Sequence, residues 1–311
     1  MYWALIALLG YFFNAVAALF DKYLLSERIQ APAVYAFFVA LFSLFALCFV
    51  PFGFEFPHVR EGGILIVSGM LFVYGLVAFY QAIKQNEISR VAPLLGAVIS
   101  VVAFLALLSP GAFHETHFGI SYLLALILLI GGGLLLSFDL PLRRGEHFSK
   151  KVLLAGFLMG LSFIFLKEGF TGGNFVTGIV WSRLGMFLGG ISLFLIPVFR
   201  RQIVDQFSHF SLKPKRATST TFLFIVNKIC AGVGAMLVAY ATYLGSLTFV
   251  QALSGLQYVF VLLLAFPLAW YFPNIYGERL KFWDWFQKAI AILLIAVGLW
   301  MATTSGIELL S

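Results

Sequence analysis

The sequence predicts an all-α membrane protein with ten transmembrane helices arranged as two inverted five-helix repeats. Of its 311 residues, 62% are hydrophobic, 17% are aromatic and only 11% are charged, whereas soluble domains carry about 25% charged residues. Ten apolar runs approach or exceed the roughly 20 residues that a membrane helix needs. These runs lack the strict alternation of barrel strands, so helices satisfy their backbone groups best.

The predicted spans leave little chain outside the membrane. They cover residues 2–20, 33–52, 62–83, 88–108, 118–137, 152–166, 175–199, 220–244, 247–271 and 282–304. The connections are short except at 139–151 and 200–219. Neither of these is long enough for a folded domain, so a large soluble domain is excluded.

Basic residues predict the orientation, because they are retained preferentially on the cytoplasmic side. With the N-terminus outside, only Arg60 and Lys167 fall in external loops, and Arg183, Lys228 and Lys288 fall within spans. The other fifteen of the twenty basic residues lie in cytoplasmic loops. We therefore expect both termini outside, in a multi-pass protein of the plasma (inner) membrane.

The two halves of the chain match each other at a nearly constant spacing. The matched residues are Asp21-Lys22 with Lys167-Glu168, Tyr35 with Trp181 and Pro51 with Pro197, all 146 apart, then Tyr80 with Tyr240 (160 apart) and Gly96 with Gly255 (159 apart). Because five helices are an odd number, the second copy enters the membrane from the opposite side. This predicts a first repeat at 1–138, a cytoplasmic linker at 139–151 and a second repeat at 152–311, an arrangement typical of secondary transporters.

Several segments resemble the drug/metabolite transporter (DMT) superfamily, in its EamA-type branch. In the first half they are AFYQAI at 78–83 and SRVAPL at 89–94. In the second half they are YATYLGS at 240–246, VQALSGLQYV at 250–259 and GERL at 277–280, with Gly298 twenty residues after the Glu. The resemblance implies ten helices in two inverted repeats, a central cavity lined by both halves, and transport of small metabolites without ATP hydrolysis. It implies no particular substrate.

Charged residues suggest how such a cavity would recognise its substrate. All thirteen acidic residues fall in loops or near span ends, so we expect no deep carboxylate. Asp21 and Glu168, at repeat-related span ends, are interpreted as interfacial anchors, with a role as proton carriers as the alternative. Arg183 and Lys228 lie inside spans, where a charge is expected to face the bundle interior or water. One hypothesis is that both cations line the cavity and attract an anionic or carboxylate-bearing substrate. The alternatives are snorkelling to the interface or pairing of Arg183 with Glu168.

Uncharged polar residues complete the predicted cavity lining. Gln251, Ser254 and Tyr258 share one helical face, whereas Gln257 points elsewhere. The full set of predicted substrate-binding residues is Asn14, Tyr80, Trp181, Arg183, Asn227, Lys228, Tyr240, Gln251, Ser254 and Tyr258. Hydrogen bonding between helices is the alternative role for each of them.

These features predict a secondary transporter that moves a small organic metabolite by alternating access. A flippase for lipid-linked intermediates is the alternative within transport, and a membrane-embedded enzyme acting on lipids is a more distant one. No catalytic constellation, phosphate loop or metal-spaced Cys/His cluster is readable, so we expect no enzyme activity, no cofactor and no metal. The net charge of +7 is explained by loops facing anionic lipid, so the expected partners are a small-molecule substrate and the bilayer, not nucleic acid.

Overall fold

All of the described secondary structure is helical. The computed structural model describes residues 2–27, 31–86, 88–107, 120–137, 150–209, 214–272 and 282–308, and no strand occurs within these ranges. Seven helical segments there are long and apolar enough to cross a bilayer. They are Tyr2–Glu27, Pro32–Phe52, Val59–Gln85, Lys150–Thr171, Phe175–Leu195, Thr220–Leu244 and Leu247–Tyr271. The protein is therefore an all-α, multi-pass membrane protein, as its composition predicted.

The described part of the first half contains five α-helices and one 3-10 segment. These are α1 (Tyr2–Glu27), α2 (Pro32–Phe42), η1 (Ser43–Phe52), α3 (Val59–Gln85), α4 (Ile88–Leu107) and α5 (Ile120–Ser137). Pro32 begins α2, since proline is pre-organised for the first helical turn. Gly53 ends η1 with a φ of 97°, a left-handed conformation that favours glycine.

The second half is more interrupted than its apolar runs predicted. It contains α6 (Lys150–Thr171), α7 (Phe175–Ser192), η2 (Leu193–Leu195), α8 (Pro197–His209), α9 (Pro214–Leu244), α10 (Leu247–Ala252), α11 (Ser254–Tyr271) and α13 (Phe282–Glu308).

One predicted span and one predicted connection are corrected by the structure. The span at 175–199 ends at Leu195, because Ile196 is extended and Pro197 starts the separate helix α8. The connection at 200–219 is largely helical, formed by α8 and the first turns of α9. The predicted span at 247–271 is confirmed as one apolar helical segment, and a turn at Leu253 divides it into α10 and α11.

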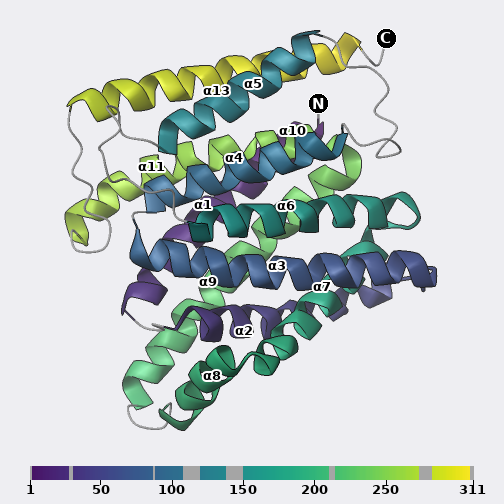
Figure 1. Ribbon diagram of the computed structural model, residues 1–311, viewed down its shortest axis with the longest axis vertical. Helices are drawn as coiled ribbons and strands as arrows, with labels where there is room; N and C mark the ends of the chain where they lie inside the picture. Colours follow the sequence, from purple (N-terminus) through teal and green to yellow (C-terminus); the bar gives the residue numbers. More distant parts are fainter. Residues whose placement is uncertain are drawn as a thin grey trace.

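The helices run side by side, with contacts between the two halves (Figure 1). α3 packs on α6 and α7, α1 packs on α9, and α5 packs on α13. Each of these pairs joins a first-half helix to a second-half helix. The main buried cluster therefore includes residues from both halves.

Glycines allow the closest of these crossings. A Cβ on Gly69 of α3 would lie 2.6 Å from the carbonyl carbon of Gly185, and one on Gly185 would lie 2.7 Å from the Cα of Ile66. The backbones of α3 and α7 are thus in contact, as small residues permit in membrane helices. Gly156 and Gly160 likewise fit against the side chains of α4. Both GxxxG pairs of the second half, Gly156/Gly160 and Gly185/Gly189, therefore lie at helix contacts.

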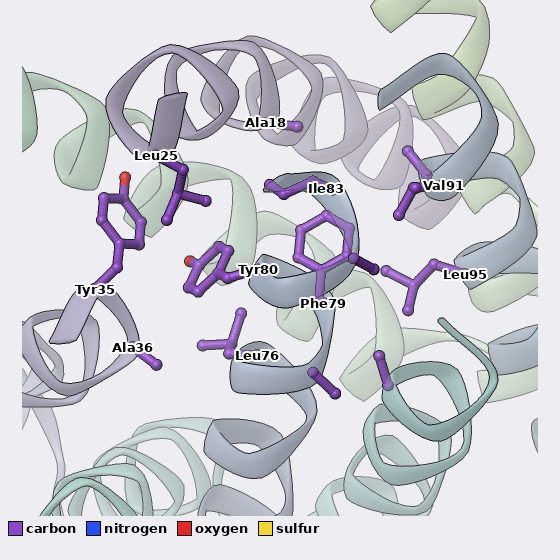
Figure 2. Packing of buried hydrophobic residues seen from close by; sticks show 14 of the residues in the cluster. Ala18, Leu25, Tyr35, Ala36, Leu76, Phe79, Tyr80, Ile83, Val91 and Leu95 are labelled. Carbon is purple, nitrogen blue, oxygen red and sulfur yellow. The ribbon is translucent and has the colours of Figure 1, made fainter. Parts of the chain in front are cut away.

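The inner faces of α1 to α4 meet in the main buried cluster. Figure 2 shows Leu25 of α1, Tyr35 of α2, Phe79 and Tyr80 of α3 and Leu95 of α4 directed into this space. The hydroxyl of Tyr80 points toward the Tyr35 ring. Two phenols in an apolar cluster need polar partners, and those partners define the site described next.

Candidate functional site: a buried ion pair between the two halves

The carboxylate of Asp21 is buried among helices, a feature that its position near a span end did not predict. The apolar run of the first span stops at Phe20, but α1 continues to Glu27. Asp21 is therefore six residues, or about 9 Å, before the end of the helix. Only 7% of the residue is exposed. A carboxylate at such a position needs a compensating charge and hydrogen-bond donors.

Residues of α9 and α2 supply those partners at one oxygen of Asp21. Lys228 Nζ lies 2.9 Å from Asp21 Oδ1 in a salt bridge, with the two side chains 8% and 10% exposed. Asn227 Nδ2 donates to the same oxygen at 2.5 Å, and the Tyr35 hydroxyl donates to it as well. The Tyr80 ring of α3 packs against the Tyr35 ring beside this carboxylate. The result is a neutral cluster of hydrogen bonds and packed rings that links α1, α2 and α3 to α9.

Aromatic rings pack around the ion pair, whose two side chains are only 8% and 10% exposed. The Tyr35 ring packs edge-on against Tyr80, with 4.8 Å between centroids, and against Phe224, at 5.3 Å. Lys228 Nζ is 4.7 Å from the centre of the Tyr35 ring and 5.4 Å from that of Phe224, both within cation–π range. Electrostatic interactions are stronger in such a buried environment than at a surface.

The neighbouring cation Lys22 has a different role. Its Nζ donates to the carbonyl oxygens of Ile83, at 2.6 Å, and Asn86, at 2.9 Å. These carbonyls belong to the C-terminal end of α3, which lacks intrahelical partners. Lys22 thus caps α3 and leaves Lys228 as the cation bound to Asp21.

Arg183 is a second charged centre, and its surroundings are very different. It lies eight residues, or about 12 Å, from the start of α7. Its Nη1 donates to the Met186 sulfur at 2.9 Å. No carboxylate partner for the guanidinium occurs among the described residues, so the alternative of an Arg183–Glu168 pair is not observed. Arg183 is a half-buried cation without a counter-ion in that part of the chain.

A third group of polar atoms lies where α10 meets α11. Thr248, Gln251 and Ser254 are buried, and Thr248 Oγ1, Gln251 Nε2 and Ser254 Oγ have no hydrogen-bond partner among the described atoms. The backbone here is secured from α4, because Ser100 donates to the Gln251 carbonyl at 2.9 Å. Buried polar groups without partners are costly in protein interiors. They are therefore favourable positions for a ligand or water.

The other residues predicted to bind substrate fall in separate places. Asn14 of α1 lies against Gly234 of α9. Trp181 of α7 is half-buried, and its indole nitrogen has no partner among the described atoms. Tyr240 is 39% exposed and stacks with Tyr243. The side chain of Tyr258 lies outside what the structure describes.

Only some of the residues predicted to bind substrate thus lie close to one another in the structure. Asn227, Lys228 and Tyr80 meet in one cluster, and Gln251 and Ser254 meet in another. Sequence reasoning missed Asp21 and Tyr35 as members of the first cluster and Thr248 as a member of the second. The available signal for Asp21 was its position directly after an apolar run, followed by the further apolar residues Tyr23, Leu24 and Leu25, which continue the helical pattern.

Comparison with known proteins supports the fold across the whole chain. No family model and no curated protein matches the sequence. Among solved structures, 22 chains match. One of them, described simply as "Crystal structure of protein", superimposes with a TM-score of 0.64 at 13% identity, covering 96% of this chain and 98% of its own. At this identity the likeness establishes a shared fold and says nothing about activity.

Replacing Tyr35 with Phe tests whether the cluster is held together as the distances indicate. The substitution removes one donor to Asp21 and the acceptor for Asn227 Nδ2, which lies 2.9 Å from the Tyr35 oxygen. Because hydrogen bonds to charged groups contribute about 1.5–3 kcal/mol, we expect Tyr35→Phe to lower the unfolding free energy by about 2 kcal/mol. Thermal and denaturant unfolding in detergent measure this loss. Tyr243→Phe, at a partly exposed ring, is the matched control, and equal stability of the two variants would contradict the assignment.

Proposed function

We propose that this protein is a secondary transporter of the DMT superfamily, EamA type, which moves a small organic metabolite across the plasma membrane by alternating access. The observation that carries the proposal is the Asp21–Lys228 cluster, which joins helices of the two halves. Transporters built from repeated halves bind their ligands between those halves, where charged groups are buried in protein. A polar centre at this position is what such a mechanism requires.

Lysine contacts support an internal repeat that relates the two halves. Lys167 of α6 donates to the carbonyl oxygens of Thr242 and Gly245, both at 2.8 Å. Lys22 makes the equivalent contact at the end of α3, and its two acceptors precede those of Lys167 by 159 residues each. Lys22 itself precedes Lys167 by 145 residues. In each half, a lysine of the first helix therefore caps the third helix of the same half.

Glycine crossings give the same two spacings independently. A Cβ on Gly75 of α3 would meet the Met159 side chain, and one on Gly234 of α9 would meet the Asn14 side chain. Gly234 follows Gly75 by 159 residues, and Met159 follows Asn14 by 145. The α3–α6 and α1–α9 contacts are thus equivalent under one relation between the halves. The contacts pair residues of α1 and α6 that are 145 positions apart, whereas the sequence match gave 146. We adopt 145 as the spacing between these two helices.

The remaining helices are long enough to bring the number of membrane spans to ten. α4, α5 and α13 contain 20, 18 and 27 residues, and helices of about 17–25 residues suffice to cross a bilayer. In Figure 1, α1 begins and α13 ends on the same side of the bundle. An even number of spans produces that arrangement, with five helices in each half.

Unequal packing between equivalent helices supports an alternating mechanism. α3 and α7 are in backbone contact through Gly69 and Gly185. The corresponding pair, α9 and α2, is connected by aromatic side chains, with Phe224 against Phe38 and Phe42. In our proposal the α3–α7 contact closes the external side, and a shift of α9 relative to α2 opens the cytoplasmic side. The Asp21 cluster lies at the joint that this shift would change.

Arg183 carries the proposal for the substrate. Lys228 is neutralised by Asp21, so it no longer attracts an anion in this state. Arg183 has no carboxylate partner among the described residues, and intramembrane cations of this kind mark substrate pathways. The substrate class that fits best is an anionic or carboxylate-bearing metabolite, whose carboxylate a guanidinium can bind with two parallel hydrogen bonds.

A thermal-shift screen of the detergent-purified protein tests this substrate class. Ligands that bind the native state raise its stability, by about 2.7 kcal/mol at a hundred times the dissociation constant. We expect carboxylates to stabilise the wild type and the exposed-lysine control Lys84→Gln, but not Arg183→Gln. Active compounds should then be taken up by proteoliposomes. If only neutral, cationic or lipid-like compounds stabilise the protein, the carboxylate proposal is wrong and the flippase alternative is favoured.

Tags at the two termini test the ten-span topology. Ten spans and the distribution of basic residues place both tags outside the cell. Labelling with a membrane-impermeant reagent on intact cells should therefore reach both. Seven spans would leave one tag accessible only after permeabilisation, and that result would contradict the paired five-helix arrangement.

A further inference from the structure

A groove lies where α7 ends and α8 begins. Its volume is about 400 Å³. Phe194, Leu195, Pro197 and Val204 form its apolar wall, and Arg200, Arg201 and Asp205 contribute charged groups. The groove exists because the extended residue Ile196 and the proline after it turn the chain out of the line of α7. None of its residues belongs to the Asp21 cluster.

The apolar residues around this groove point to a position at the membrane surface. Leu195 is 83% exposed and Val198 is 62% exposed, whereas Ile203 on the opposite face of α8 is fully buried. α8 packs on α2 through that buried face. A short helix with basic residues and exposed aliphatic side chains, directly after a membrane span, lies in the interface between headgroups and acyl chains. The exposed Leu195 and Val198 then contact lipid.

The charges of the groove define the chemistry of its occupant. Arg200 and Arg201 are both exposed, and neither has a carboxylate partner in the part of the chain that the structure describes. Adjacent guanidinium groups suit a phosphate, which they bind with several charge-assisted hydrogen bonds. Asp205 adds a carboxylate to the same groove. It disfavours a doubly charged phosphate and can accept a hydrogen bond from a hydroxyl.

We propose that this groove binds the headgroup of an anionic phospholipid that carries a hydroxyl, of the phosphatidylglycerol kind. The singly charged phosphodiester lies between Arg200 and Arg201, and the glycerol hydroxyl donates to Asp205. The acyl chains follow Leu195 and Val198 into the bilayer. Phosphatidic acid, with a more highly charged monoester and no headgroup hydroxyl, fits this set of groups less well. The site is separate from the proposed transport function, so either proposal can fail without the other.

Lipid retention by the full-length protein tests the site. The protein is purified in nanodiscs of phosphatidylcholine containing a minor fraction of phosphatidylglycerol or of phosphatidic acid, and bound lipids are counted by native mass spectrometry. Basic residues at a membrane surface contribute about 1 kcal/mol each. We therefore expect the double variant Arg200→Gln/Arg201→Gln to retain phosphatidylglycerol roughly 30-fold less well than the wild type. The double variant Lys84→Gln/Lys151→Gln removes two charges elsewhere and should retain it normally.

Two further variants separate specific recognition from general attraction. Asp205→Asn should narrow the preference for phosphatidylglycerol over phosphatidic acid, because it removes the negative charge beside the phosphate. Arg200→Lys/Arg201→Lys keeps both charges and should retain more lipid than the Gln pair. Lipid retention by the Lys pair would show that α8 still folds when both arginines are replaced. Equal retention of phosphatidylcholine and phosphatidylglycerol by the wild type would overturn the proposal. So would equal losses in the two charge-removal variants.

Discussion

A carboxylate and an ammonium group buried together must remain paired, and much of this structure depends on that constraint. Asp21 and Lys228 are each exposed by about a tenth or less, so separating them without a substitute partner would leave two uncompensated charges in an apolar core. Asn227 and Tyr35 reduce the cost of burial by adding donors to the same carboxylate oxygen. Because the pair joins α1 to α9, it fixes the two halves relative to each other in this state.

Small residues and large aromatic residues distribute the remaining contacts between the halves. Glycines bring α3 and α7 into backbone contact, which leaves no room for a side chain at Gly69 or Gly185. Between α2 and α9, the phenylalanine and tyrosine rings around Phe224 fill the space instead. Glycine contacts are rigid, whereas rings can change rotamers as helices shift. The polar cluster lies between α2 and α9, and in the proposed alternating mechanism the ion pair would break and re-form as these helices shift.

Composition and hydropathy could predict the class of the fold and the position of most helices, because the bilayer imposes a minimum length and demands internal backbone hydrogen bonds. Composition and hydropathy could not predict which helices continue beyond the end of their apolar segments. Asp21 follows the last apolar residue of the first span, yet α1 continues beyond it and carries the carboxylate inside. The division at Pro197 was likewise not predicted, and the helical nature of α8 depends on packing of Ile203 against α2.

The least predictable feature of the site was which side chains contact each other in the folded protein. Lys228 and Arg183 occupy similar sequence positions, since each is a basic residue inside an apolar span. Within the described residues, Lys228 meets a carboxylate and Arg183 does not. That difference arises from contact between residues 207 positions apart, which no local pattern encodes. Thr248 was missed for a related reason, since an isolated threonine in an apolar run normally bonds to its own helix.

The coupling energy between Asp21 and Lys228 tests the central claim most directly. In a double-mutant cycle, Asp21→Asn and Lys228→Met are measured singly and together by equilibrium unfolding in the same detergent. The account predicts that each single change costs about 3 kcal/mol, because it leaves a buried charge unpaired, and that the double change costs far less than their sum. Additive losses would contradict it, since they would show that the two side chains do not depend on each other in the folded protein.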